Sequence, residues 1–216
     1  AKLQPIATDM HALGNPWISY SVYLNNSFLP GLLQLMILLV TVFSIGSEMK
    51  RATSREWLRT ADDSIIIAIT GKLIPQTIIF FSMGLLYLSL LYGYLHFPMH
   101  NSIWHMIFAM FLLVVASQSF AVIIMCFAPS LRIGLSVGGL VGVLSLSIAG
   151  FSFPVPAMYL PLPVRHYFLI YVDQALNGIP LYYSRVHYVA LILFAVASTP
   201  LLPRLKKALM RQVYVP

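Results

Sequence analysis

Charged residues are scarce in this chain of 216 residues. Asp, Glu, Lys and Arg make up 9% of it, against roughly 25% in ordinary soluble domains. Cysteine is nearly missing as well, because Cys126 stands alone inside an apolar run and the sequence offers no partner for a disulfide. These shortages argue against a disulfide-stabilised secreted domain and against an ordinary water-soluble domain.

The sequence also lacks the short motifs that carry nucleotide chemistry. Around Gly71-Lys72, the phosphate-binding loop pattern fails, because Ile66 stands where that loop needs its first glycine and Leu73 where it needs Ser or Thr. The zinc motif HExxH does not occur, and a single cysteine cannot supply a structural zinc pair. We therefore predict no catalytic residue and no cofactor held by this chain.

Three histidines within ten residues raise the question of a metal site. They are His96, His100 and His105. Pro98 interrupts the helical spacing between the first two, and no carboxylate lies nearby to complete a ligand set. We expect interfacial histidines in a loop, and no bound metal.

Ionisable residues are missing from most of the apolar runs, which instead contain glutamine, serine and threonine. Acids and bases inside a membrane are costly and usually functional, so their scarcity argues against an intramembrane enzyme and against a proton-coupled carrier. Asp173 lies in a proline-rich segment, where we expect a structural pair with Arg165 or His166. Any transport by this protein must therefore draw its energy from elsewhere.

Long apolar runs dominate what is present, and the mean hydropathy is +0.85. Runs near twenty residues are long enough to cross a membrane as helices, so we predict an all-α polytopic membrane bundle over residues 28–207. The run 65–95 is too long for one straight span, and we expect Gly71-Lys72 and Pro75 to break it, with 65–71 near the interface. The five predicted spans are 28–46, 73–95, 103–127, 133–150 and 186–203.

The remaining segments differ from these spans. Residues 1–27 are too polar to span, and we expect them to be the end of an extracytoplasmic segment of a longer chain. Five prolines in 151–185 forbid one continuous helix and favour a broken or re-entrant element at the outer interface. Gly134, Gly138 and Gly142 allow close helix approach, either within one subunit, at a subunit interface or along a conduit wall.

About half of the charged residues lie between Ser47 and Lys72. At helical spacing, Glu48, Arg51 and Arg55 fall on one face, and Asp62 to Ser64 could cap a new helix beginning near Ile65. One interpretation is a solvated loop between two spans. The other is an amphipathic helix over residues 48–63 that lies on the membrane surface and docks a partner.

The distribution of Lys and Arg gives an orientation. If residues 47–72 are cytoplasmic, ten of the thirteen Lys and Arg residues fall on that side, including those of the tail 208–216 and the residues before it. This positive-inside bias places the N-terminus of the sequence outside and its C-terminus in the cytoplasm. The basic residues cluster at the ends of apolar runs, so the net charge of +7 does not indicate nucleic-acid binding.

Several motifs together resemble a known family. In order they are an outer Asn15-Pro16, a span that opens with LPG, the E-x-K-R-x-T sequence of Glu48–Thr53, Gly71-Lys72 before a proline, GFSFPVPAMYLP over 150–161, and a late Gly-Ile-Pro at 178–180. This pattern is similar to the permease subunit of type-2 ABC exporters, particularly the bacterial multidrug-type permeases, over residues 14–207.

The resemblance implies a subunit of the bacterial inner membrane that exports a hydrophobic or amphipathic substrate, drug or lipid-like, by alternating access. It implies a dimer of permeases in membrane lipid, identical or not, with a cytoplasmic ABC ATPase that carries ATP and Mg²⁺ and docks on the helix 48–63. The implied docking residues are Glu48, Lys50, Arg51, Arg55, Glu56, Trp57 and Arg59. The implied substrate path or exit includes Gly138, Gly142, Gly150, Phe151, Phe153, Pro154 and Met158.

Two positions depart from the family's usual pattern. Ala52 stands where glycine is frequent, and Ala61 where proline is frequent. Both changes favour a continuous helix. The main rival hypothesis is a non-transporting membrane scaffold or assembly protein, and an intramembrane enzyme is less consistent with the sequence.

Overall fold

The computed structural model describes residues 20–147 and 162–211, and the regular structure in those ranges is helical. An apolar chain in a membrane must satisfy its backbone groups internally, which helices do. The elements are α1 (Tyr20–Lys50), α2 (Ser54–Thr60), α3 (Ile65–Leu88), the π-helix η1 (Ser89–Tyr94), α4 (Ile103–Phe127), α5 (Leu131–Leu146), α6 (Pro163–Tyr171), the π-helix η4 (Val172–Leu176), α7 (Leu181–Val196), the 3₁₀ turn η5 (Thr199–Leu201) and α8 (Leu202–Arg211).

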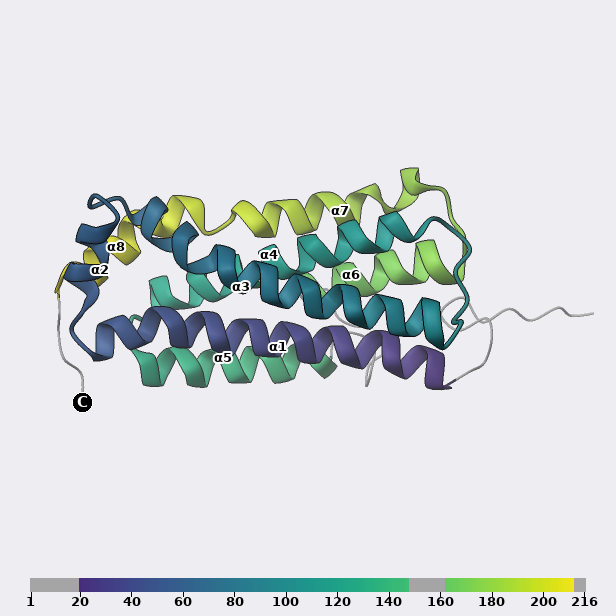
Figure 1. The fold of residues 1–216 in the computed structure, drawn as a ribbon, viewed down its shortest axis with the longest axis horizontal. Coiled ribbons are helices and arrows are strands. Elements are labelled where there is room, and N and C mark those ends of the chain that lie inside the picture. Colours follow the sequence, from purple (N-terminus) through teal and green to yellow (C-terminus); the bar gives the residue numbers. More distant parts are fainter. Residues whose placement is uncertain (1–19, 148–161, 212–216) are drawn as a thin grey trace, which may run out of the picture.

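The long helices lie side by side along one axis (Figure 1). The α1, α3, α4 and α7 helices run the length of the bundle, and α5 lies against α1. The short helices α2 and α8 lie together at one end, which we call the charged end. The chain in the described ranges therefore starts at one end of the bundle and finishes at the other.

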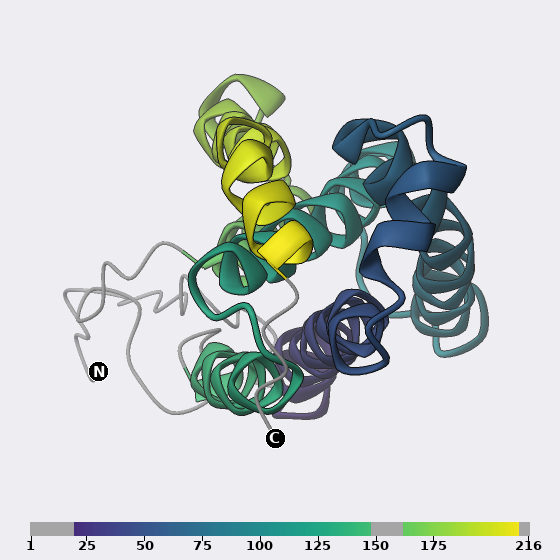
Figure 2. The same ribbon diagram turned by 90° about the vertical axis from the view of Figure 1, so that its left-hand side faces the viewer.

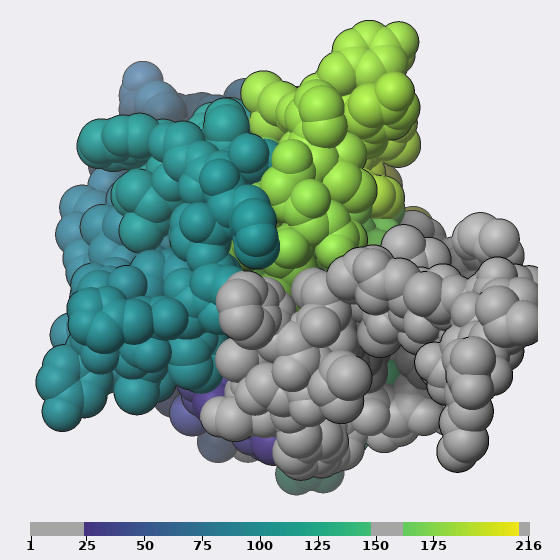
Figure 3. All heavy atoms as spheres, turned by 90° about the vertical axis from the view of Figure 1, so that its right-hand side faces the viewer, coloured from purple at the N-terminus to yellow at the C-terminus, as the bar shows by residue number. Residues whose placement is uncertain are grey.

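Figure 3 views the end opposite to the charged end. There the connection between η1 and α4 lies beside the connection between η4 and α7. Backbone hydrogen bonds from His100 to Ala175 (3.1 Å) and from Asn101 to Gln174 (3.2 Å) join the two connections. A residue with positive φ follows each π-helix two positions after its last residue: His96 after η1 and Gly178 after η4.

The core is centred on α4, and its apolar residues form two main clusters. One cluster joins α4 to α6, η4 and α7 around Met110, Tyr167 and Tyr171. The other joins α4 to α2, α3 and α8 around Leu58, Met125 and Leu205. Large apolar side chains also cover the outer surface of α3, α5 and α7, which suits contact with lipid.

Within the ranges that the structure describes, four helical segments are long and apolar enough to cross a membrane: Leu24–Lys50, Ile65–Tyr94, Ile103–Phe127 and Leu181–Arg211. The α4 helix occupies the range predicted for the third span, 103–127. The α5 helix has 16 residues, or roughly 24 Å at 1.5 Å per residue, and the rest of the predicted span 133–150 lies outside the described residues. The structure therefore supports a multi-pass helical membrane protein.

Three helix ends differ from the predicted span boundaries. The first helix begins at Tyr20 rather than 28, so part of the predicted extracytoplasmic segment 1–27 is helical. The last long helix is Leu181–Val196, and the turn η5 at Pro200 separates it from α8, where the sequence predicted one span over 186–203.

The predicted break at Gly71-Lys72 and Pro75 is absent, because α3 runs through both positions. Pro75 removes one backbone donor, and a membrane-spanning helix tolerates this where neighbouring groups compensate. Helix α3 continues directly into η1, so the whole run 65–94 forms one element.

Small residues bring α5 close to α1. A Cβ on Gly134 would lie 2.8 Å from Met125 Sδ and 3.0 Å from Val42 Cγ1, and a Cβ on Gly142 would overlap Leu35. Gly134, Gly138 and Gly142 are all buried. Of the three alternatives left open for this glycine series, the structure shows packing within one subunit.

Polar side chains link neighbouring helices inside the bundle. Gln34 donates to Ser145 Oγ (2.8 Å) and accepts from the backbone N–H of Val164 (2.8 Å), which joins α1 to α5 and α6. Thr41 on α1 donates to Gln76 on α3 (3.1 Å). Thr77 on α3 donates to Gln118 on α4 (2.8 Å). Each of these polar groups thereby meets its requirement for a partner away from water.

Candidate docking surface at the charged end

The helix predicted over residues 48–63 is broken in the structure. Helix α1 ends at Lys50, and Ala52 takes a positive φ of 58°. The N–H of Thr53 donates to the carbonyl of Glu48 (3.0 Å), and the N–H of Ala52 to that of Met49 (3.3 Å). This is the pairing of a Schellman cap, which closes a helix on a left-handed residue. The prediction of a continuous helix, based partly on Ala52 and Ala61, was wrong.

Helix α2 occupies only Ser54–Thr60 and ends with a second cap of the same kind. Asp62 and Asp63 have positive φ, and their N–H groups donate to the carbonyls of Arg59 (3.1 Å) and Leu58 (2.9 Å). Aspartate tolerates this conformation better than most residues. The next helix then begins at Ile65, where the sequence predicted it.

A compact polar cluster forms where α1, α2 and α3 meet, and we call it the Glu48 cluster. Lys72 Nζ lies 2.6 Å from Glu48 Oε1 and also donates to the carbonyl of Ser44 (2.8 Å). Thr53 donates its hydroxyl to Glu48 Oε2. The Lys72 ammonium stands 4.3 Å from the ring centre of Trp57, within cation–π range.

Burial gives the Glu48 cluster a structural character. The side chains of Lys72 and Glu48 are only 21% and 24% exposed. Glu48 and Trp57, both predicted docking residues, therefore face inward and hold α2 against α1 and α3. The sequence analysis named Lys72 only together with Gly71 and predicted no partner for it. Its pairing with Glu48, 24 residues earlier in the chain, is known only from the folded structure.

The other predicted docking residues face outward. Lys50, Arg51, Arg55, Glu56 and Arg59 are all exposed at the charged end. Arg55 reaches α8, where its guanidinium donates to the carbonyl of Met210 (3.4 Å). Leu58, also on α2, is fully buried. The short helix thus presents a charged face outward and anchors its apolar face in the bundle.

Helix α8 completes this end of the molecule, and the sequence analysis treated it only as a basic tail. Leu202, Leu205 and Leu209 are buried at i, i+3 and i+7, a spacing that indicates an amphipathic helix. Lys206 Nζ donates to the carbonyl of Asp63 (2.6 Å). Figure 2, which looks at the charged end, shows α8 crossing the bundle near α2.

The predicted exit region is described only in part. Gly150, Phe151, Phe153, Pro154 and Met158 lie outside the described residues. Gly138 and Gly142 are buried on α5, against Val42 and Leu35 of α1. The role of all seven residues in a substrate path stays a prediction.

In the described part of the proline-rich segment, α6 continues directly into η4, and residues 177–180 then interrupt the helical structure before α7 begins at Leu181. The segment is therefore not one continuous helix, as predicted. Gln174 is fully buried and donates to Ser184 Oγ (2.8 Å). Asp173 accepts a hydrogen bond from the same hydroxyl (3.0 Å), a partner that the sequence did not predict.

His166 meets another histidine in this region. Its Nδ1 lies 3.3 Å from Nδ1 of His187. Burial, together with the nearby His187 and Arg165, lowers the pKa of His166 to about 4. His166 is therefore neutral at physiological pH, so its ring can take part in this contact without bringing a second positive charge beside Arg165.

The histidines of the 96–105 segment do not come together around a metal position. His100 Nδ1 lies 2.9 Å from the carbonyl of Ala175, which ties the η1–α4 connection to η4. Among the described residues, no group of three or more His, Cys, Asp or Glu is placed to hold a metal ion.

Comparison of the chain with protein-family models, with curated proteins and with solved structures finds no match in any of the three. The site must therefore be interpreted from its own geometry. That geometry is a charged, anchored surface suited to binding, at one end of an apolar bundle.

Proposed function

We propose that this chain is the transmembrane permease subunit of an ATP-driven ABC exporter. The partner ATPase carries ATP and Mg²⁺ and docks on the charged face of α2. A second permease subunit completes the transporter in the membrane. Alternating access between the two subunits then moves a hydrophobic or amphipathic substrate outward.

The observation that carries this proposal is the anchoring of α2. A helix that transmits force from a partner must be fixed to the elements it moves. The Glu48 cluster fixes α2 to α1 and α3 through Trp57, Lys72 and Thr53. Leu58 packs it into the cluster shared with α4 and α8. A displacement of α2 is thereby passed directly to the long helices.

The placement of charge supports the cytoplasmic assignment of this end. Helices α2 and α8 and the start of α5 bring most of the basic residues to the charged end. At the other end, the start of α7 contributes Arg185. Arg165 lies partway along the bundle, because the N–H of the neighbouring Val164 donates to Gln34 in the middle of α1. This asymmetry follows the positive-inside rule.

Charge reversal on α2 tests the docking surface. We expect the amount of ATPase that co-purifies in mild detergent to fall at least about tenfold in the double variant Arg55→Glu/Arg59→Glu. The reason is that like charges replace complementary ones at the contact. Both side chains are exposed, so membrane insertion should be unchanged. The matched control is Arg185→Glu, the same reversal at the opposite end, where Arg185 stacks on Tyr182.

The pull-down also separates the two function classes. A stoichiometric P-loop ATPase with the wild-type chain, lost in the double variant and kept in Arg185→Glu, supports the permease assignment. Wild-type recovery of the ATPase by the double variant contradicts docking on α2. If no ATPase accompanies the wild-type chain, the scaffold hypothesis takes its place.

A further inference from the structure

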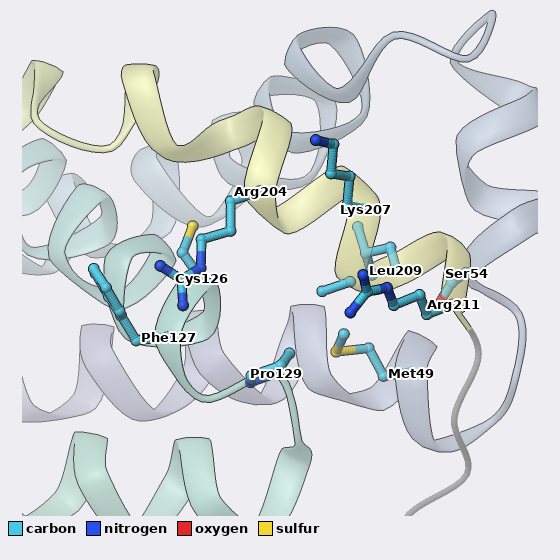
Figure 4. A pocket seen from close by; sticks show the side chains of 10 residues that line it. Met49, Ser54, Cys126, Phe127, Pro129, Arg204, Lys207, Leu209 and Arg211 are labelled. Atoms are coloured by element: carbon cyan, nitrogen blue, oxygen red, sulfur yellow. The ribbon is translucent and has the colours of Figure 1, made fainter.

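A cavity of about 430 Å³ opens beside α8 at the charged end. We call it the α8 cavity. Its walls come from α8, the end of α4, the α4–α5 turn, the end of α1 and the start of α2 (Figure 4). Its volume lies within the range of roughly 300–1,000 Å³ that small-molecule sites occupy. Neither Arg55 nor Arg59 lines it, although Arg55 contacts α8 at Met210.

The charge of the α8 cavity has one sign. Arg204, Lys207 and Arg211 follow one another at i, i+3 and i+7, so they share one side of α8. All three line the cavity, and none of its described lining residues is acidic. The Arg204 guanidinium stands 4.6 Å from the ring centre of Phe127, which holds it at the wall while its N–H groups stay available.

The rest of the lining is apolar. Met49, Phe127 and Leu209 face the same space as the basic side chains. A ligand that fits both parts carries a negative group next to a hydrophobic portion. A free anion would use only the basic part of the cavity.

The depth of the cavity points to the source of such a ligand. The candidate spans end at Lys50 on α1 and at Phe127 on α4, so Met49 and Phe127 mark the boundary between hydrocarbon and headgroups. Basic pockets between helices at this depth suit anionic lipid headgroups. The amphipathic α8, with leucines inward and basic residues elsewhere, belongs at the same interface.

We propose that the α8 cavity binds the headgroup of an anionic phospholipid. Arg204, Lys207 and Arg211 hold the phosphate-containing headgroup, and the apolar wall receives the upper part of the acyl chains. Occupation of this site bridges α8 to the ends of α1 and α4. The proposal requires only a membrane protein and does not depend on the transporter assignment.

Native mass spectrometry of the purified chain in detergent tests the site, with phosphatidylglycerol and phosphatidylcholine as probes. We expect phosphatidylglycerol to bind at least about tenfold more tightly. The triple variant Arg204→Gln/Lys207→Gln/Arg211→Gln should lose this preference, since each basic side chain near an anionic headgroup contributes roughly fivefold. The matched control is Lys206→Gln, which removes one charge from the same helix outside the α8 cavity, and it should keep the preference within about twofold.

Three results would overturn the proposal. They are equal affinity for the two lipids, a triple variant that still prefers phosphatidylglycerol, and displacement of the lipid by inorganic phosphate at the same concentration, which indicates a free-anion site. If the variant that keeps the lipid preference also turns a dimer into a monomer, the basic residues of α8 belong to a subunit interface. If the triple variant does not fold, the single variant Arg211→Gln at the end of α8 takes its place. We expect its preference for phosphatidylglycerol over phosphatidylcholine to fall about fivefold.

Discussion

At the scale of single residues, the Glu48 cluster shows what the sequence could and could not reveal. The E-x-K-R-x-T and Gly-Lys motifs stand out in the chain, but their residues are 24 positions apart. Periodicity assigns each motif to a helix and does not bring two helices together. The structure does so, because α2 turns the chain back and places Lys72 beside Glu48.

The Glu48–Lys72 pair should contribute measurably to stability. We expect a double-mutant cycle with Glu48→Gln and Lys72→Met to give a coupling energy on the order of 1 kcal/mol, the upper part of the range for partly exposed pairs. The measurement is unfolding in mixed micelles of sodium dodecyl sulfate and a mild detergent. A cycle with Glu48→Gln and Lys206→Met should show no coupling. Additive effects in the first cycle would refute the pairing.

At the scale of elements, long apolar segments were the easiest to predict. Helix α4 has the predicted bounds because residues 103–127 are mostly apolar. Ser102 stands at its N-cap, and Pro129 follows shortly after its last residue. Local breaks were harder to predict. Ala52 closes α1 in a conformation that favours glycine, so composition predicted continuity where tertiary contacts impose a turn. Pro75 predicted a break where α3 continues. Helix α8 was missed because ten residues with four basic side chains resemble a tail.

The contact between α1 and α5 permits a test with two neighbouring glycines. We expect Gly142→Ala to destabilise the protein by about 1–3 kcal/mol, because the new methyl group would overlap Leu35. Gly139→Ala is the matched control, since its Cβ would meet Leu39 Cδ2 at 3.9 Å. Alanine favours helix there by up to roughly 1 kcal/mol, so this variant should be neutral or stabilising. Unfolding in detergent measures both, and equal effects would contradict the packing.

At the scale of the whole molecule, the bundle has one charged end and one end of aromatic and polar loops. The sequence predicted this polarity from the placement of Lys and Arg, and the described helices bring those residues together as expected. What the sequence could not provide is the packing order of the helices, because every span is apolar on most sides. That order depends on small residues and on a few polar contacts.

Labelling with a membrane-impermeant thiol reagent tests the orientation. In a Cys126→Ala background, we expect His100→Cys and Arg185→Cys to react from outside in intact cells. Arg55→Cys and Lys207→Cys should react only after permeabilisation, because α2 and α8 lie at the other end. The opposite pattern would invert the proposed topology.

The polar contacts inside the bundle have a consequence for motion. Hydrogen bonds tie α1 to α3, α5 and α6, and α3 to α4. Tyr188 and Ser198 tie the last long segment to α4 through His105 and Ser119. Sliding one helix past another breaks such a bond where no water can replace it. We therefore expect the described bundle to move as a rigid block, with any large rearrangement taking place where this block meets its neighbours.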